Sequence, residues 1–127
     1  MTVLLDTAIL VDHLRGDPRA HALLAGLVDA DEAIWAATPT RTELIAGIRA
    51  AERKALDQLF AALDWLDITP EIADDAGELA RRHRRSHHGI DTVDCLVAAA
   101  ALAIGARLLT LNVRHFPMIV GLEAAYR

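Results

Sequence analysis

The sequence has little that would tie it to a membrane, an export route or an oxidising compartment. Cys95 is the only cysteine among 127 residues, so no disulfide can form within the chain. No apolar run reaches the roughly 20 residues needed to cross a bilayer. The apolar N-terminal segment, residues 1–16, is interrupted by Asp6 and Asp12 and lacks a basic start, which disfavours a signal peptide. We expect a cytoplasmic protein that does not bind a membrane.

Positive charge is also scarce, and it is unevenly placed. The formal net charge is -5, and Lys54 is the only lysine. A nucleic-acid-binding module is usually basic, so a simple electrostatic DNA- or RNA-binding domain is disfavoured. The segment ARRHRRSHHG, residues 80–89, nevertheless holds four arginines and three histidines. It is either the solvated end of a helix or a patch that binds RNA or a protein partner. The candidate RNA-binding side chains are Arg81, Arg82, Arg84 and Arg85.

Short apolar runs alternate along the chain with longer segments of helical periodicity. The runs predict strands at residues 2–5, 33–38, 67–69 and 106–110, with a further short element at 118–122. Helices are predicted between them at residues 7–16, 17–30, 40–50, 52–66 and 70–85, with a last one in the stretch 89–102 that Gly105 closes. Strands that alternate with helices indicate a mostly parallel sheet covered on both faces. We therefore predict one α/β domain over residues 1–127, with a central sheet of four or five strands.

Carboxylates follow the predicted strands at the points where a parallel sheet binds its ligands. Asp6 follows the first strand, Glu43 lies early in the helix after the second strand, and Asp94 begins the last predicted helix. Because the carboxyl ends of parallel strands share one edge, these acids are expected to meet in one crevice. Asn112 follows the fourth strand and is expected at the same edge. Such a cluster of like charges is tolerable when Mg²⁺ or Mn²⁺ binds to its oxygen atoms.

Each acid also has a purely structural explanation. Asp6 can cap the helix that follows it. The segments TRTE, ending at Glu43, and DTVD, from Asp91 to Asp94, both fit the capping box that closes helix N-termini. Taken singly, each acid is more easily explained as a cap than as a metal ligand. Within the DTVD pair we assign Asp91 to the N-cap and Asp94 to the crevice.

Several stretches, taken in order, resemble one protein family. They are VLLDTAILVDHL, TELIAG, VDCLVAAAALAIGARLLTLNVRHF and a closing GL, and they run from residue 3 to about residue 122. The chain resembles PIN-domain proteins of the VapC toxin type. This resemblance implies an α/β/α sandwich and an Mg²⁺- or Mn²⁺-dependent ribonuclease, the toxin of a type II toxin–antitoxin pair. It also implies a homodimer, an antitoxin protein as partner in a higher-order complex, and RNA as substrate. Asp6, Glu43 and Asp94 match the three main acids of the family.

The fourth acidic position of the family is not matched. The family often carries an Asp where Asn112 or His115 stands in this chain. Asn112 can still bind a metal through its carbonyl oxygen. Asp91 can supply the missing charge, and His115 is either a proton shuttle or a loop histidine without a role. Thr110, close by, is expected either to hydrogen-bond near Asp6 or to lie on the surface.

Two other functions fit part of the sequence. A signalling receiver domain is also a parallel α/β unit with an acidic Mg²⁺ pocket, but it needs a lysine at the end of a late strand. Lys54 lies far from any predicted strand end. A catalytically inactive PIN module that acts only by binding a partner is favoured by the missing fourth acid. The three acids that remain disfavour it.

Overall fold

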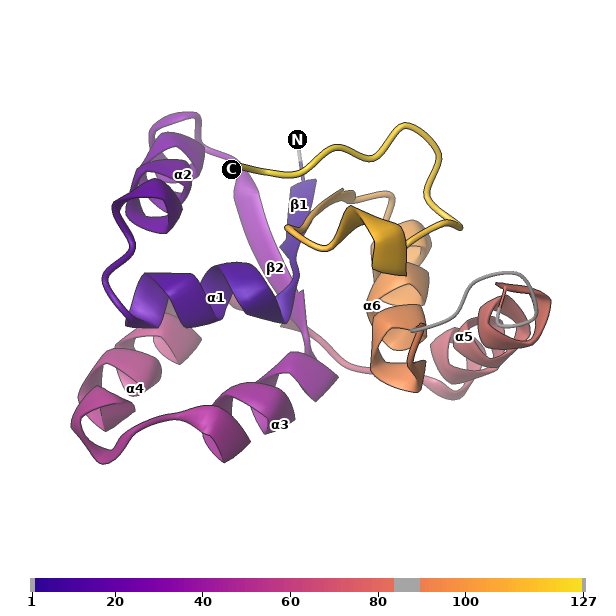
Figure 1. Cartoon of the computed structure of the whole chain (residues 1–127), viewed down its shortest axis with the longest axis horizontal. Helices are drawn as coiled ribbons and strands as arrows, with labels where there is room; N and C mark the ends of the chain where they lie inside the picture. The colour runs from indigo at the N-terminus through magenta and orange to yellow at the C-terminus, as the bar shows by residue number, and fades with distance from the viewer. Residues whose placement is uncertain (1, 84–89, 127) are drawn as a thin grey trace.

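A four-stranded parallel sheet forms the centre of the protein. The computed structural model describes residues 2–83 and 90–126 (Figure 1). The strands are β1 (Thr2–Leu5), β2 (Ala33–Ala37), β3 (Asp64–Leu66) and β4 (Arg107–Leu109). Their order is β3-β2-β1-β4, every neighbouring pair is parallel, and Leu4 lies opposite both Trp35 and Leu108. The predicted parallel sheet is therefore confirmed, with the first two strands of the chain at its centre.

Helices cover both faces of this sheet. Those of the described residues are α1 (Thr7–Leu14), α2 (Pro18–Asp29), α3 (Thr38–Gly47), α4 (Arg53–Ala62), α5 (Pro70–His83) and α6 (Thr92–Ala103), with two short 3-10 helices, η1 (Ala50–Glu52) and η2 (Val113–His115). Figure 1 shows α1 to α4 on one side of the sheet and α5 and α6 on the other. The expected three-layer α/β/α sandwich is confirmed.

The alternation of side chains along β1 fills both layers of the core. Val3 and Leu5 pack in the cluster that includes α1 and α4, whereas Leu4 packs in the cluster that includes α5 and α6. All three are fully buried. A strand buried on both faces is continuously apolar instead of alternating, which is what the sequence of β1 shows. The residue that follows β1 is thereby fixed at the sheet edge.

The helix α6 is buried over most of its surface. Its small side chains Cys95 and Ala98 to Ala101 are at most 3% exposed, so the helix can lie close to both α5 and the sheet. The predicted burial of Cys95 is confirmed. Within residues 2–83 and 90–126, no helix is long and apolar enough to cross a membrane. The buried apolar side chains of α6 pack in the same cluster as those of α5.

Several predicted elements differ from the structure. The third strand lies at Asp64–Leu66 and not at 67–69, because the helix predicted over 52–66 ends at Ala62. Leu63 and Leu66 continue the helical spacing, yet residues 64–66 pair with β2. Without this pairing, the backbone N–H and C=O groups on that side of β2 would lack hydrogen-bond partners. Residues 118–122 form no strand. In the described chain past β4, the only strand-like pairing is an isolated bridge between Thr110 and Ala124.

Gly105→Ala is expected to lower the free energy of unfolding by about 1–2 kcal/mol, the cost of a left-handed backbone for an L-residue. Gly105 has φ +63° and no atom within 4 Å of the added methyl group, so backbone conformation alone sets the effect. Gly26→Ala is the matched control, since that site is equally open but lies inside α2. There the same change should stabilise by about 0.5–1 kcal/mol. Urea unfolding of both variants measures the two effects, and a loss at both sites would contradict this explanation.

Candidate active site

The chain places Asp6 at the carboxyl edge of the sheet. Its backbone N–H donates to the carbonyl oxygen of Leu109, which continues the pairing of β1 with β4 by one residue (2.9 Å). Asp6 is only 6% exposed, so its carboxylate needs internal partners. The backbone N–H of Thr7 donates to Asp6 Oδ1 (2.8 Å), and the hydroxyl of Thr110 donates to Oδ2 (2.7 Å). Asp6 is therefore both the N-cap of α1 and a residue of the edge.

Thr110 links the ends of β1 and β4 at this edge. It is fully buried, so the expectation that it hydrogen-bonds near Asp6 is confirmed and the surface alternative is wrong. Its hydroxyl oxygen also accepts a hydrogen bond from the backbone N–H of Asn112 (3.0 Å). Thr110 thus fixes the Asp6 carboxylate and the start of the segment after β4 at the same time.

Glu43 reaches the edge from α3, although not as a capping residue. The helix begins at Thr38, with Ala37 as an N-cap that makes no side-chain bond, so the predicted TRTE capping box is wrong. Pro39 favours this earlier start, because proline is well tolerated in the first turn. Glu43 consequently lies in the second turn, where its Oε1 accepts a 2.6 Å hydrogen bond from the hydroxyl of Thr7. The contact of Thr7 with Glu43 was not predicted from the sequence. The only signal for it was the position of Thr7 directly after Asp6.

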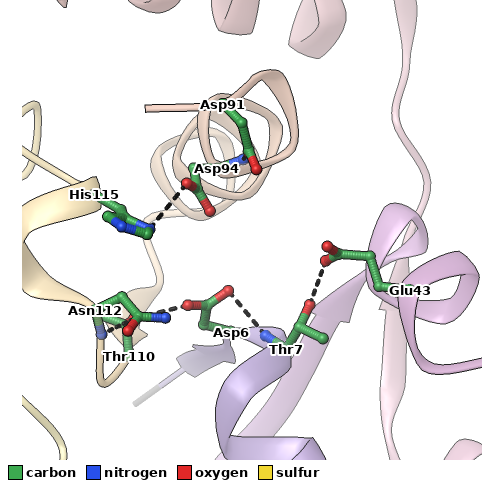
Figure 2. A network of polar contacts seen from close by, with 8 residues as sticks. All are labelled: Asp6, Thr7, Glu43, Asp91, Asp94, Thr110, Asn112 and His115. Carbon is green, nitrogen blue, oxygen red and sulfur yellow. Dashed lines mark hydrogen bonds and ion pairs between the residues drawn. The ribbon is translucent and has the colours of Figure 1, made fainter. Parts of the chain in front are cut away.

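Asp91 and Asp94 divide as predicted at the start of α6. Asp91 is the N-cap, and its Oδ1 accepts a hydrogen bond from the backbone N–H of Asp94 (2.8 Å). The side chain of Asp94 is 16% exposed and points towards the sheet edge (Figure 2). Its Oδ2 lies 3.3 Å from Nδ1 of His115, which belongs to η2. His115 is thus in contact with the acids, whereas Asn112 is exposed beside them.

Mutual repulsion and burial define the electrostatics of this cluster. Burial raises the pKa of Asp6, and the hydrogen bonds from Thr110 and Thr7 offset part of that rise. Burial, followed by the negative charges of Asp91 and Asp6, raises the pKa of Asp94 to about 6. The charge of His115 acts in the opposite direction on both Asp6 and Asp94. Positive charge placed between Asp6 and Asp94 would therefore stabilise both ionised carboxylates.

The donor set of the cluster fits a hard divalent cation. The side chains that Figure 2 brings to this edge from β1, α3 and α6 offer carboxylate oxygens, the ligands that Mg²⁺ and Mn²⁺ prefer. Within the described ranges, no three His, Cys, Asp or Glu side chains are close enough to form a ready metal-binding group. Glu43 is held by Thr7, so binding of a cation by all three acids requires side-chain rotation.

The predicted arginine patch is only partly described by the structure. Arg81 and Arg82 are exposed in the last turn of α5. Arg82 lines a hollow against the C-terminal half of α6, whereas Asp94 lies at the N-terminal end of that helix. Arg84 and Arg85 lie outside the described residues. The structure therefore does not bring Arg82 into the carboxylate cluster.

The fold is an α/β/α sandwich with acids gathered at the carboxyl edge of its parallel sheet. Domains of this class bind their ligands at that edge. The family described as "PIN domain" matches residues 3–119. The chain is 52% identical over 123 residues to Ribonuclease VapC19 of Mycobacterium tuberculosis (strain CDC 1551 / Oshkosh), covering 97% of this chain and 98% of that protein. It is 38% identical over 124 residues to Ribonuclease VapC10 of the same strain, covering 98% and 92% respectively. The chain belongs to the PIN-domain family and, within it, to the VapC type.

Solved structures agree with this fold. A toxin–antitoxin complex from Klebsiella pneumoniae matches with a TM-score of 0.83 at 21% identity, covering 98% of both chains. VapBC2 from Rickettsia felis, bound to a DNA fragment from its promoter, matches with a TM-score of 0.81 at 23% identity, covering 98% of this chain and 97% of that one. At these identities the likeness shows the fold. The family match excludes the receiver domain, and Lys54 indeed lies within α4, away from the strands.

Asp94→Asn is expected to stabilise the metal-free protein above about pH 6, and not below about pH 4. The folded-state pKa of Asp94 is raised from 3.8 to about 6. Between these values the unfolded chain loses the Asp94 proton first, so stability falls as pH rises and remains lowered above the folded pKa. Thermal melts in EDTA at about pH 4 and about pH 7.5 test this linkage. An equal gain at both pH values would show that the charge of Asp94 is not its cause.

Proposed function

We propose that this protein is a metal-dependent endoribonuclease and the toxin of a type II toxin–antitoxin pair. The observation that carries the proposal is the approach of the Asp6 and Asp94 carboxylates at the carboxyl edge of the sheet, with Glu43 beside them (Figure 2). The 52% identity to a protein named Ribonuclease VapC19 supports RNA as the substrate. The acidic net charge of -5 is compatible with this substrate, because a bound cation offsets the local negative charge.

The proposed metal ligands are Asp6, Asp94 and Glu43, with Mg²⁺ or Mn²⁺ as the cation. When bound, such an ion lowers the pKa of a water molecule and stabilises the charge that develops on the phosphate. The residues of the protein hold the ligand side chains in place. Thr110 and the backbone of Thr7 hold both oxygens of Asp6, so this carboxylate is oriented before any ion arrives.

The start of α6 is oriented in the same way. Asp91 caps the helix through the backbone N–H of Asp94, which fixes the direction of the Asp94 side chain. Glu43 is held by the Thr7 hydroxyl, at the distance of a strong charge-assisted bond. The arginines proposed to contact the RNA backbone are Arg81, Arg82, Arg84 and Arg85. Arg82 lies against the C-terminal half of α6, away from the Asp94 end, which suits contacts with phosphates away from the cleaved bond.

Asp6→Asn and Asp94→Asn are each expected to reduce RNA cleavage to background with the fold intact. Each change removes one charged ligand while preserving the side-chain shape and the capping ability, since Asn caps helices as well as Asp does. Asp91→Asn is the matched control and should keep most of the activity. Asp91→Ala should lose about 1 kcal/mol of stability, the usual cost of a lost N-cap.

Cleavage of RNA with added Mg²⁺ or Mn²⁺, next to a thermal melt of each variant, tests these expectations. Full activity in both Asp6→Asn and Asp94→Asn would contradict the nuclease site. A wild-type protein that cleaves no RNA with either ion would favour the alternative function, a catalytically inactive PIN module that acts by binding a partner. The absence of an acid at Asn112 and His115 is what keeps that alternative open.

We further propose that the protein forms a homodimer and binds an antitoxin through an apolar segment of that partner. Two solved neighbours are complexes of a toxin with its antitoxin, which supports a protein partner. A hollow of about 630 Å³ lies between α1, α2 and α4, and apolar side chains including Leu24 and Leu59 line it. Val28, also in this lining, is 64% exposed. Exposed Ile45 and Leu102 offer apolar surface for the contact between two copies.

Val28→Glu is expected to weaken the complex with the antitoxin, because a carboxylate would be buried against an apolar segment. Val120→Glu is the control, since Val120 is 97% exposed and outside the hollow. Co-purification with a tagged antitoxin, followed by light scattering, measures both variants. The same light-scattering run shows whether the free protein has twice the 13.8 kDa mass of the chain. Equal recovery of both variants would place the antitoxin elsewhere.

A further inference from the structure

His115 is the residue at the carboxylate cluster whose chemistry differs from that of its neighbours. Its side chain is 45% exposed, so the ring can turn, and its Nδ1 lies 3.3 Å from Asp94 Oδ2. Figure 2 shows the ring on the side of the cluster opposite Glu43.

The backbone of η2 holds His115 in this place. The N–H of His115 donates to the carbonyl oxygen of Asn112 (2.9 Å), and the N–H of Phe116 donates to that of Val113 (3.0 Å). Phe116 is 1% exposed in the core, which anchors the end of the short helix. Thr110 anchors its start through the N–H of Asn112. The nearness of the imidazole to Asp94 is therefore built into the fold.

The 3.3 Å separation suits two atoms that share one cation. Metal ligands about 2.0–2.2 Å from an ion lie roughly 3 Å from each other when they are neighbours in its coordination shell. The other candidates for the fourth ligand fit less well. Within the described residues, Asp91 bonds to the backbone N–H of Asp94, and Asn112 makes no ion pair or side-chain hydrogen bond with an acid. Among these three residues, only His115 contacts the side chain of a proposed metal ligand.

We propose that His115 is a nitrogen ligand of the divalent cation and that it makes the site prefer Mn²⁺ to Mg²⁺. This inference rests on the proposed metal-dependent function. An imidazole ligand carries no negative charge, unlike a carboxylate. The site therefore binds less tightly a hard ion that is held mainly by charge. Mg²⁺ binds oxygen ligands almost exclusively, whereas the first-row ions accept an imidazole nitrogen, Mn²⁺ the least strongly among them. Asp6 and Asp94 supply the oxygens common to both ions.

Three variants separate this role from simple pairing of His115 with Asp94. His115→Asp restores an all-oxygen site, His115→Ala removes the ligand, and Arg114→Ala is the control, since Arg114 is exposed on the same short helix. Mn²⁺ binding is followed by electron paramagnetic resonance, with Mg²⁺ as competitor. Electron spin-echo modulation of bound Mn²⁺ detects nitrogen from a coordinated imidazole directly, and a thermal melt checks the fold of each variant.

We expect a nitrogen signal in the wild type and in Arg114→Ala, and its loss in both His115 variants. His115→Ala should raise the Kd for Mn²⁺ by at least about tenfold, the scale on which groups around a metal site act. His115→Asp should shift the preference towards Mg²⁺. Tight Mn²⁺ binding without a nitrogen signal would overturn this inference and leave the proposed function standing. Tighter Mn²⁺ binding in His115→Ala would overturn it too, since the imidazole would then compete with the metal for Asp94. No Mn²⁺ binding in the wild type would overturn both.

Discussion

The buried carboxylate of Asp6 is the constraint on which the rest of the site depends. An ionised side chain that is 6% exposed is costly unless its oxygens are bonded. Thr7 and Thr110 provide those bonds, and they bring the start of α1 and the end of β4 to the same point. The hydroxyl of Thr7 extends the arrangement to Glu43, and the segment after Thr110 carries His115. One satisfied acid thus organises the elements that surround it.

Asp94 takes its position from the start of a helix. Asp94 lies one turn into α6, held by the cap that Asp91 forms, and α6 is immobilised by its buried alanines. The pKa of Asp94 is raised to about 6, first by burial and then by the negative charges of Asp91 and Asp6. Because the fold keeps these negative charges close together, binding of a cation between Asp6 and Asp94 is favoured. The proposed chemistry and the electrostatic cost therefore have the same origin.

Much of the fold and part of the site followed from the sequence, for identifiable reasons. Apolar runs set β1, β2 and β4, the rule that parallel strands share a carboxyl edge placed Asp6, and the capping pattern DTVD placed Asp94 at the start of α6. The position of β3 was wrong because Leu63 and Leu66 keep helical spacing on both sides of the boundary. The bond from Thr7 to Glu43 spans 36 residues, and local patterns carry no information about such a pair. The contact of His115 with Asp94 could not be predicted for the same reason, because it depends on the irregular segment after β4.

The sheet order has a consequence for how the protein behaves at high concentration. Both outer strands, β3 and β4, are three residues long, and each begins with an exposed charged residue, Asp64 or Arg107. A short, charged edge offers few free backbone groups to a strand of another molecule, which is how natural sheets avoid edge-to-edge aggregation. The longer apolar strands β1 and β2 are enclosed between these edges. The order of the strands therefore keeps the longest apolar strands of the chain away from pairing with another molecule.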